Sequence, residues 1–528
     1  MNNTNYERIP QEKFRFTQTD ANIHDQKLET KSRSYFADAM LRFKKNKSSV
    51  VAAYIILFLV IFSLIVPIFS PYSFKEGERD EDKTYINFPP YIESIAEKGW
   101  GIFDGATTLN SQNERQIQAL HAIGIETGRD PVIRILSETE TIEKYRGKDR
   151  VVKYYALEVN RYYLVGIVKK NISYADFELI QQFQKETGVQ VLYPMVRQED
   201  IYGQKITNSI PANENIWYKC SDTKNTPKLD ADGNFIPAYC TDKTLEGISG
   251  YNSTRIEGDD GSYIYSFAKS GSVQIRVDYY TFVQYEQWKE NGEYSAPMYI
   301  FGTNEMGQDL FTAIAVGARF SLVFALFVSA INLFIGAIYG AIQGYYGGLI
   351  DLLLDRVSDV LSGVPMIVVV TLFNLHLAEK VGEIGAFLLA FIATGWIGMA
   401  ALTRKQFYRF KSQEHILAAR TLGASDKRLM FKHIFPNALG TIVTSCALVI
   451  PGVVSSETSL TYLHIIDLSK FAGTTIGTLM EQGQRAMTSS PHAMLYPSLF
   501  FSLLMISFNL FGNGLRDAFN PTTKGAEG

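Results

Sequence analysis

The stretch that decides the fold is Ser49–Phe69, with the sequence SVVAAYIILFLVIFSLIVPIF. It contains no charged side chain. At about 1.5 Å of rise per residue, a helix of this length covers the roughly 30 Å of hydrocarbon in a bilayer. A buried helix of a water-soluble protein rarely stays free of charge for so long. The sequence therefore predicts a membrane-spanning helix here.

Charges of opposite sign flank this first span. The basic residues Arg42, Lys44, Lys45 and Lys47 precede it, and the acidic residues Glu76, Glu78, Asp80, Glu81 and Asp82 follow it. By the positive-inside rule, the N-terminal segment is expected in the cytoplasm and the acidic side outside. Met1–Lys47 is polar and lacks the short apolar core of a cleaved signal peptide.

Further apolar runs follow Ile300, roughly at Phe320–Gly344, Met366–Leu377, Ile384–Leu402, Leu439–Leu460 and Met494–Gly512. The run from Met366 is short, and we expect it to extend back through Val360 and Leu361. The sequence thus predicts an α-helical polytopic membrane protein with six transmembrane helices and both termini in the cytoplasm. The stretch Thr403–His433 supports this topology, because it holds eight basic residues against two acidic ones and would lie inside.

An acidic block, 72–300, separates the first span from the others. It holds 26 Lys and Arg against 34 Asp and Glu, a net charge of −8, whereas the rest of the chain carries +5. Tyr174–Lys185 has a helical pattern, and Val189–Tyr193 and Ser272–Tyr280 resemble strands. We expect a large α+β extracytoplasmic insertion between helices 1 and 2. The overall net charge of −3 gives no indication of nucleic-acid binding.

Small residues recur every four positions in the second span, at Gly336, Gly340, Gly344 and Gly348. On a helix they form one stripe, against which a neighbouring helix can pack closely. The alternative is that glycine is simply common in membrane helices. The regular spacing favours a packing face formed by the first three, with Gly348 past the helix end.

Few polar residues lie at membrane depth, and Asn332, Ser455 and Glu457 are the candidates for a gate or a pathway lining. An ionisable group inside a span is a functional hypothesis by default. Glu457, however, lies near the end of its span and could equally reach interfacial water. No ladder of buried carboxylates supports proton-driven transport.

Three cysteines are present. Cys446 lies in an apolar span and is expected to be a packing residue. Cys220 and Cys240 both lie in the acidic block and could form a disulfide if that block faces an oxidising space. Two free thiols are nearly as compatible with the sequence. No pattern of metal ligands stands out.

The most informative stretch is the loop Glu414–Asn437, EHILAARTLGASDKRLMFKHIFPN. It predicts a short helix through Leu422, a stop at Gly423 and a second short helix capped by Ser425. Its small residues allow close approach of another surface, and Leu417, Leu422 and Met430 are apolar in a loop that should be wet. Docking to a cytoplasmic partner explains these features. A loop lying on lipid headgroups is the alternative.

This loop resembles the coupling loop of ABC importer permeases, whose pattern is E-A-A, three residues, G, nine residues, I-x-L-P. The residues Ala418, Ala419, Gly423 and Pro436 match at the same spacing. The sequence departs from the pattern at Leu417, His433 and Phe435. The surrounding residues are similar to the C-type permease of oligopeptide and dipeptide importers.

Two further segments carry the same resemblance. Phe301–Leu322 resembles the family's G-T-D-x-x-G-R-D…G-A-R-x-S-L signature, with Asn304 and Gln308 departing. Phe508–Pro521 resembles its C-terminal F-N-x-x-G-D-G-L-R-D-A-x-D-P, with Asn513 and Asn520 departing. Ser456–Leu463 weakly matches a fourth segment. Together with the first span, the resemblance covers Phe301–Lys524.

The resemblance implies a type I ABC importer permease in a bacterial cell membrane, forming half of the translocation pathway for oligopeptides. The partners would be a second permease, two cytoplasmic ATPases and an external, lipid-anchored peptide-binding protein. ATP and Mg would bind to the ATPases, since this chain has no G-x-x-x-x-G-K-[ST] phosphate loop, binds no cofactor and is not itself an enzyme. The expected ATPase contact consists of Glu414, Leu417, Ala418, Ala419, Arg420, Leu422, Gly423 and Pro436.

The expected order of domains is a cytoplasmic segment (1–48), the first span (49–71), the inserted domain (72–300), the permease core (301–515) with its coupling loop (411–437), and a cytoplasmic tail (516–528). The insertion lies outside the family core. A docking platform for the binding protein or the partner permease is its first expected role, followed by a sensing domain and an external hydrolase. Two other functions stay open: a permease for dipeptides, nickel or glutathione, and a membrane scaffold that presents the external domain.

Overall fold

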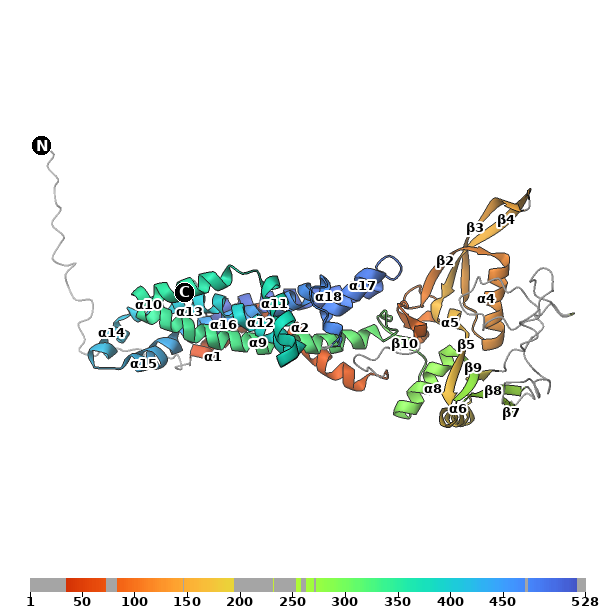
Figure 1. Ribbon diagram of the computed structural model, residues 1–528, viewed down its shortest axis with the longest axis horizontal. Coiled ribbons are helices and arrows are strands. Elements are labelled where there is room, and N and C mark those ends of the chain that lie inside the picture. Colours follow the sequence, from red (N-terminus) through yellow and green to blue (C-terminus); the bar gives the residue numbers. More distant parts are fainter. Residues whose placement is uncertain are drawn as a thin grey trace, which may run out of the picture.

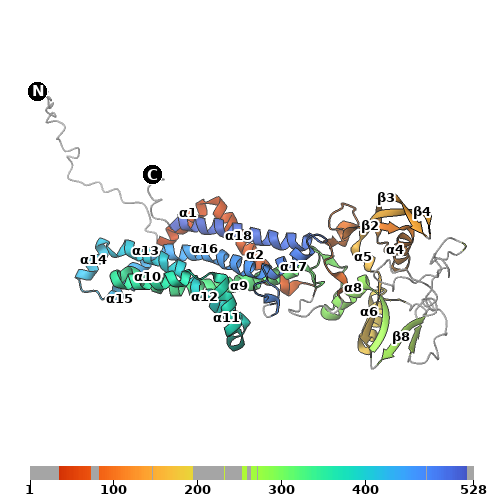
Figure 2. The same cartoon turned by 45° about the horizontal axis from the view of Figure 1, so that its top comes forward.

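The structure, a computed structural model, describes residues 35–72, 83–145, 147–193, 231, 253–257, 263–269, 272–470 and 473–519. Figures 1 and 2 show a long helical bundle with a mixed α+β unit at one end. The opposite end of the bundle carries the short helices α14 and α15. The chain therefore separates the predicted coupling loop from the inserted segment by the whole length of the bundle.

Among the described residues, five helices or helix runs are long and apolar enough to cross a membrane. They are Lys47–Phe69 (α2), Leu310–Tyr346 (α9), Glu383–Lys411 (α12 and α13), Asp426–Tyr462 (α15, a π-helical turn and α16) and His492–Phe519 (α18). A sixth span results if the pair Gly348–Ser362 (α10) and Met366–Val381 (α11), bent by 78°, is counted as one. The chain is thus a multi-pass membrane protein with five or six spans among the described residues.

The predicted third span differs from a straight helix. The helical path does extend back through Val360 and Leu361, but in the separate helix α10. Pro365 stands before α11 with an extended backbone (φ −57°, ψ 135°). Proline has no N–H to continue the helical ladder and restricts the residue before it, so the chain turns at this point.

The bundle closes around an apolar core contributed by α2, α9, α11, α12, α16 and α18, including Leu59, Phe324, Val370, Phe387 and Leu504. The first described helix, Tyr35–Lys45 (α1), packs against the end of α18 through Ala39, Phe43, Ala518 and Phe519. Both ends of the described chain therefore lie at the α14–α15 end of the bundle. The remaining bundle elements are Ile397–Lys411 (α13), Glu383–Gly395 (α12), Glu414–Thr421 (α14), Asp426–Arg428 (α15), Phe435–Tyr462 (α16), Leu468–Lys470 (η5) and Ile476–Ala486 (α17).

In its described residues, the α+β unit combines three small sheets with short helices. Its sheets have the strand orders β1-β10, β2-β4-β3 and β5-β9-β8-β7, with β6 also pairing with β9. The pairings are antiparallel. The strands are Tyr91–Ile92 (β1), Ala106–Asn113 (β2), Val132–Tyr145 (β3), Lys148–Asn160 (β4), Ile167–Ser173 (β5), Leu192–Tyr193 (β6), Ser253–Glu257 (β7), Tyr263–Lys269 (β8), Ser272–Asp278 (β9) and Met298–Tyr299 (β10). The helices are Lys83–Tyr85 (η2), Glu93–Ala96 (α3), Glu114–Thr127 (α4), Arg161–Val165 (α5), Tyr174–Thr187 (α6) and Tyr279–Asn291 (α8).

Local capping explains where the helices of this unit begin and end. Asn113 and Gln116 form a capping box at the start of α4, and Ser173 caps α6. The glycines Gly128 and Gly188 end these helices with the positive φ angles that such stops require. The predicted helix from Tyr174 is therefore present and runs two residues further than expected, to Thr187.

Two predicted strands are shorter in the structure than in the sequence analysis. The strand expected at Val189–Tyr193 covers only Leu192–Tyr193. The strand expected at Ser272–Tyr280 ends at Asp278, whose carboxylate accepts a hydrogen bond from the backbone N–H of Tyr280 and caps α8. An N-cap aspartate outweighs the β-propensity of the two tyrosines that follow it.

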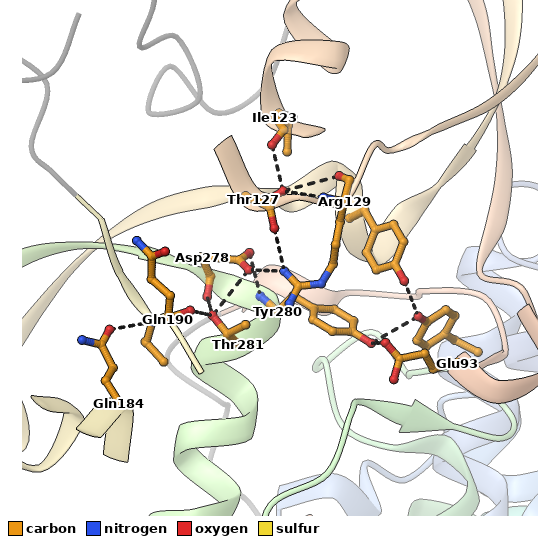
Figure 3. A network of polar contacts seen from close by, with 12 residues as sticks. Glu93, Ile123, Thr127, Arg129, Gln184, Gln190, Asp278, Tyr280 and Thr281 are labelled. Atoms are coloured by element: carbon orange, nitrogen blue, oxygen red, sulfur yellow. Dashed lines mark hydrogen bonds and ion pairs between the residues drawn. The ribbon is translucent and has the colours of Figure 1, made fainter. Parts of the chain in front are cut away.

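Asp278 also links three elements of the unit (Figure 3). Arg129, which follows α4, donates a hydrogen bond of 2.8 Å to the Asp278 carboxylate, and its guanidinium lies 4.6 Å from the centre of the Tyr280 ring. Tyr280 in turn donates to Glu93 of α3. Burial raises the pKa of Asp278 to about 6, against the opposing effect of Arg129. The ion pair with Arg129 therefore offsets part of the desolvation cost that favours the neutral form of Asp278.

Arg129→Ala is expected to destabilise the α+β unit by on the order of 3 kcal/mol at pH 7, because it leaves a buried carboxylate unpaired. Since the pKa of folded Asp278 is raised above the ordinary value of 3.8 to about 6, the folded state binds its proton more tightly, and this group's contribution to stability falls as the pH rises between those values. The penalty should therefore shrink as the pH falls below about 6, where the folded Asp278 carboxyl takes up its proton. Hydrogen exchange of the β9 and α8 amides in the intact protein, followed at several pH values, measures this loss of stability. The double variant Arg129→Ala/Asp278→Asn should recover most of the loss, and no recovery would contradict the assignment.

The motif around Phe301–Asp309 joins the unit to the bundle. Thr303 is buried, accepts a hydrogen bond from the Phe88 N–H at 2.8 Å and donates to the Tyr85 carbonyl. Asp309 caps α9 by accepting from the Thr312 N–H at 2.8 Å. A side chain at Gly302, whose φ is +77°, would lie 2.3 Å from the Phe88 carbonyl oxygen. The tight packing of this turn fixes the unit to the start of α9.

Candidate functional site

The predicted coupling loop forms a compact elbow at the end of the bundle, comprising α14, the turn 422–425, α15 and a π-helical turn, Leu429–Ile434. It connects the end of α13 to the start of α16. Figure 1 shows α14 and α15 at the extreme end of the molecule, beyond the main helices. We call Glu414–Ile434 the elbow from here on.

An apolar cluster holds the inner face of the elbow against the bundle. Ile416, Leu429, Met430 and Ile434 are buried together with Phe407 of α13. The expectation that Met430 belongs to an exposed docking face is therefore wrong. Met430 belongs to the π-helical turn, and its side chain is buried in the same cluster as Phe407 of α13. Ile416 was not singled out from the sequence, although its apolar character within a polar stretch could have indicated burial.

The turn of the elbow presents small and apolar groups to the solvent. Leu422 is 88% exposed and Leu417 is 45% exposed. Ala418 and Gly423 are exposed as well, and Ala419 is half-buried. An exposed leucine at a sharp turn contributes nothing to the core of this chain. Such a face is what a close protein–protein contact requires.

Gly423 ends α14 in the manner expected from the sequence. Its φ is +82°, and no atom lies within 4 Å of the position that a Cβ would take. The N–H of Ala424 donates to the Ala419 carbonyl at 3.1 Å, and the N–H of Gly423 donates to the Arg420 carbonyl at 3.0 Å. This is the Schellman arrangement, which favours glycine at the left-handed position. Ser425, by contrast, stands at the N-cap of α15, but its side chain accepts no capping hydrogen bond.

Arg420 and α15 are tied to the end of α9. The Arg420 guanidinium donates to the Tyr345 hydroxyl at 3.4 Å, and that hydroxyl donates to the Asp426 carboxylate at 2.5 Å. Arg420 therefore has a partner within this chain, in addition to the contact expected from the resemblance. Glu414 and Pro436, at the two ends of the loop, are exposed. Tyr345 and Asp426 were missed by the sequence analysis, because their proximity depends on the packing of α9.

The predicted glycine stripe lies against α13. A Cβ on Gly336 would meet the Trp396 carbonyl oxygen at 2.7 Å, and a Cβ on Gly340 would meet that of Ala400 at 2.2 Å. A Cβ on Gly344 would meet the Phe407 Cβ at 2.5 Å. Gly348 leaves the stripe, because it begins α10 and has no neighbour within 4 Å of its Cβ position. The glycines thus allow α9 and α13 to approach backbone to backbone.

An ion-pair network joins α10 to α13 close to this stripe. Arg404 contacts Asp351 at 2.7 Å and Asp355 at 2.6 Å. Tyr408 donates a hydrogen bond to Asp351. From the sequence, Arg404 counted only as one of the basic charges of Thr403–His433 that indicate the topology. These four polar groups on two helices could have indicated the pairing only if the turn from α9 into α10 had been foreseen.

Glu457 is fully buried in the bundle, so the alternative of a water-exposed span end is wrong. One of its carboxylate oxygens accepts a hydrogen bond from Ser321 of α9 at 2.9 Å. The other, Oε1, has no hydrogen-bond partner among the described residues. The short helix α17 covers this region: a Cβ on its Gly477 would lie 2.8 Å from Thr461, and one on Gly317 of α9 would lie 2.8 Å from the Thr475 backbone.

The helix α17 was not predicted. Its signal is a capping box at Thr475 and Thr478 followed by an amphipathic run, which is too short for a span.

The other two candidate pathway residues differ in burial. Asn332 is buried and donates to the Phe391 carbonyl at 3.5 Å, and Ser455 is half-buried on α16. The structure brings Glu457 next to α9 and α17, whereas Asn332 lies beside α12.

The predicted cysteine pair, Cys220 and Cys240, lies outside the described residues. Within the described ranges, no group of three or more His, Cys, Asp or Glu side chains could hold a metal ion. The pair His121 and Asp130, 2.6 Å apart, is exposed on the α+β unit and has no third ligand there.

Comparison with known proteins identifies the class. Residues 333–525 match the family of binding-protein-dependent transport system inner membrane components, and residues 34–90 match the N-terminal transmembrane domain of oligopeptide transport permease C. The chain belongs to this family of ABC importer permeases. Within it, the chain belongs with the C-type permeases of oligopeptide and dipeptide transport systems, which confirms the resemblance seen in the motifs.

Individual relatives support this placement. The oligopeptide permease OppC of Bacillus subtilis is 38% identical over 221 residues, which cover 42% of this chain and 71% of that protein. The dipeptide permease DppC of the same organism is 36% identical over 222 residues, covering 42% of this chain and 68% of that protein. The glutathione permease GsiD of Escherichia coli is 32% identical over 229 residues, covering 43% and 73%. The two family matches leave residues 91–332 uncovered.

Proposed function

We propose that this chain is the C-type permease subunit of an ATP-driven oligopeptide importer, forms half of the translocation pathway, and couples to ATPase subunits through the elbow. The observation that carries the coupling proposal is the exposed turn at Leu422 and Gly423, set on a base of buried residues at the tip of the bundle. A loop that lay on lipid headgroups would be expected along the side of the bundle, with its apolar groups turned toward the membrane.

The proposed assembly contains a second permease, two cytoplasmic ATPases and an external, lipid-anchored binding protein. ATP and Mg are held by the ATPases, and this chain supplies no ATP site. We propose that both termini lie in the cytoplasm, because α1 and the end of α18 lie on the same side of the bundle as the basic elbow. The α+β unit then lies outside, as part of the external face of a bacterial cell membrane.

Reconstitution tests this function. The four membrane and ATPase subunits in liposomes should accumulate labelled oligopeptide only when ATP and the binding protein are both supplied. The names of the relatives favour peptides, with dipeptides and glutathione as the competing cargoes. Uptake of one of these in place of oligopeptides would redefine the cargo. ATP hydrolysis that does not respond to any binding protein would support the scaffold alternative instead.

We place Glu457 in this mechanism as the residue that fastens the outer ends of α9, α16 and α17. ATP-driven importers rock between two states, and a buried carboxylate with one free acceptor oxygen can exchange partners as the helices move. Asn332 and Ser455 are kept as secondary candidates for the pathway lining.

Glu457→Leu is expected to leave the amount of assembled protein unchanged, because replacing a buried carboxyl by an apolar group of similar volume is often neutral or stabilising. Transport per assembled complex should fall by about tenfold, which is a typical size for a lost coupling between two sites. Peptide uptake normalised to protein amount measures it, and Glu457→Gln, which can still accept from Ser321, serves as the conservative control. Unchanged uptake by Glu457→Leu would reduce Glu457 to a packing residue.

A further inference from the structure

The α+β unit contains a groove of about 560 Å³ outside the regions matched by the family. The loop after α3, the start of β3 and the end of β4 form its walls. Two backbone links hold this loop next to the β1–β10 ribbon: the Ile92 N–H donates to the Phe103 carbonyl at 2.8 Å, and Tyr91 bridges to Asp104. Because β10 leads directly into the junction with α9, the groove lies on the part of the unit nearest the bundle.

Large apolar side chains line this groove without cover. Trp100 is 64% exposed, and Ile133 across the groove is 47% exposed. The ammonium of Lys98 lies 5.1 Å from the centre of the indole ring and leaves most of that ring to the solvent. The β3–β4 register is irregular around Ile133 and Leu136, so these residues leave the regular alternation of the strand. Tryptophan is enriched among the residues that contribute most of the binding energy in protein contacts.

The groove carries an excess of negative charge. Four carboxylates line it: Glu97, Asp104, Asp130 and Glu158. Arg134 pairs with Glu158, and His121 contacts Asp130. In the part of the chain that the structure describes, Glu97 and Asp104 have no basic partner. A molecule seated here should therefore present Lys or Arg beside apolar side chains.

A projecting arm rises from the same wall. The strands β3 and β4 continue well beyond the sheet as a two-stranded ribbon, as Figure 1 shows. The third strand, β2, pairs with β4 only from Tyr154 to Asn160. Ile142 and Val151, near the end of the ribbon, are exposed. An isolated two-stranded ribbon is marginally stable in water, so a partner that covers it would stabilise it.

We propose that the groove and this arm together are the docking surface for the external binding protein, which meets them through a basic surface with apolar side chains at its centre. The second permease is the weaker candidate, because permanent subunit interfaces are large and apolar, whereas this one is lined by carboxylates. Charge-lined surfaces suit a partner that arrives and leaves in each transport cycle. The proposal rests on the importer function above and adds the site where delivery takes place.

The test is a titration of the reconstituted complex with its binding protein, followed by binding-protein-stimulated ATP hydrolysis. Trp100→Ala and Glu97→Lys should each raise the concentration of binding protein needed for half-maximal stimulation by about tenfold. The maximal rate and the basal hydrolysis should stay unchanged, since neither side chain is part of the bundle. Glu178→Lys on α6, which is exposed on another side of the unit, is the matched charge control and should titrate as the parent protein does. Trp100→Phe should restore most of the affinity.

Three outcomes would overturn the proposal. The first is a parental titration by both variants. The second is a loss of basal hydrolysis, which would show that the changes act on the bundle. The third is weakened binding of free peptide to the complex in the absence of the binding protein, which would make the groove a substrate site. Failure of the unmodified complex to respond to any binding protein would instead refute the importer function, so the two failures are distinguishable.

Discussion

Gly423→Asp is expected to leave the chain folded and inserted in the membrane but to abolish transport-coupled ATP hydrolysis. The Cβ position of Gly423 faces open space, so the new carboxylate meets nothing within this chain. In the proposed contact it would be buried unpaired against the ATPase, at a cost on the order of 3 kcal/mol, which weakens docking by more than about a hundredfold. Binding-protein-stimulated ATP hydrolysis and peptide uptake, each normalised to assembled complex, are the measurements.

Two controls separate this effect from backbone strain. Gly423→Ala imposes the same positive φ on an L-residue without the charge, and should retain partial coupling. Gly292→Asp places the same side chain at another helix end with positive φ (+74°) and open space, but in the α+β unit. The complex assembled with this variant should hydrolyse ATP at the parental rate. Normal peptide uptake by Gly423→Asp would refute the assignment of the elbow.

Gly340→Ala is expected to remove most of the stable protein, although it adds a single methyl group. That methyl would lie 2.2 Å from the Ala400 carbonyl oxygen, and a backbone atom cannot turn aside as a flexible side chain can. Separating α9 from α13 would also disturb the packing at Gly336 and Gly344. We expect a loss on the order of 3 kcal/mol or more, at the upper end of overpacking changes.

Gly398→Ala supplies the matched control for this change. It lies on α13 itself, where no atom stands within 4 Å of its Cβ position. Alanine is favoured over glycine in a helix by up to about 1 kcal/mol, so this change should be neutral or stabilising. The thermal denaturation midpoint of the purified protein in detergent compares the two. Equal midpoints for both variants would mean that the stripe does not set the distance between these helices.

The amino-acid sequence predicts those parts of this protein that depend on local patterns. Charge-free runs locate the spans, the four-residue glycine period identifies the face of α9 that meets α13, and Gly423 marks the end of α14. The motif matches are also local, and they identify the family without any knowledge of contacts between distant residues. Each of these features depends on residues that are close in the sequence.

The features that were missed depend on contacts between distant residues. Met430 looked exposed because nothing in the sequence shows that Phe407 lies above it. The sequence does not decide whether Glu457 is buried or reaches interfacial water, because the covering helix α17 is too short to stand out as a span. The pairing of Arg404 with Asp351 requires the turn from α9 into α10. The two tyrosines after Asp278 favour a strand by their β-propensity, and only the structure shows that Asp278 caps a helix that begins with them.

The account depends most on the contact between the elbow and an ATPase subunit, and site-specific photo-cross-linking tests it directly. A photoreactive amino acid at Leu422, the most exposed apolar side chain of the elbow, should form an adduct with the ATPase subunit in the assembled complex. The same group at Leu463, exposed at the opposite end of α16, should form none. Adducts from position 422 with lipid alone, or labelling of that position from outside the cell, would contradict the coupling role of the elbow.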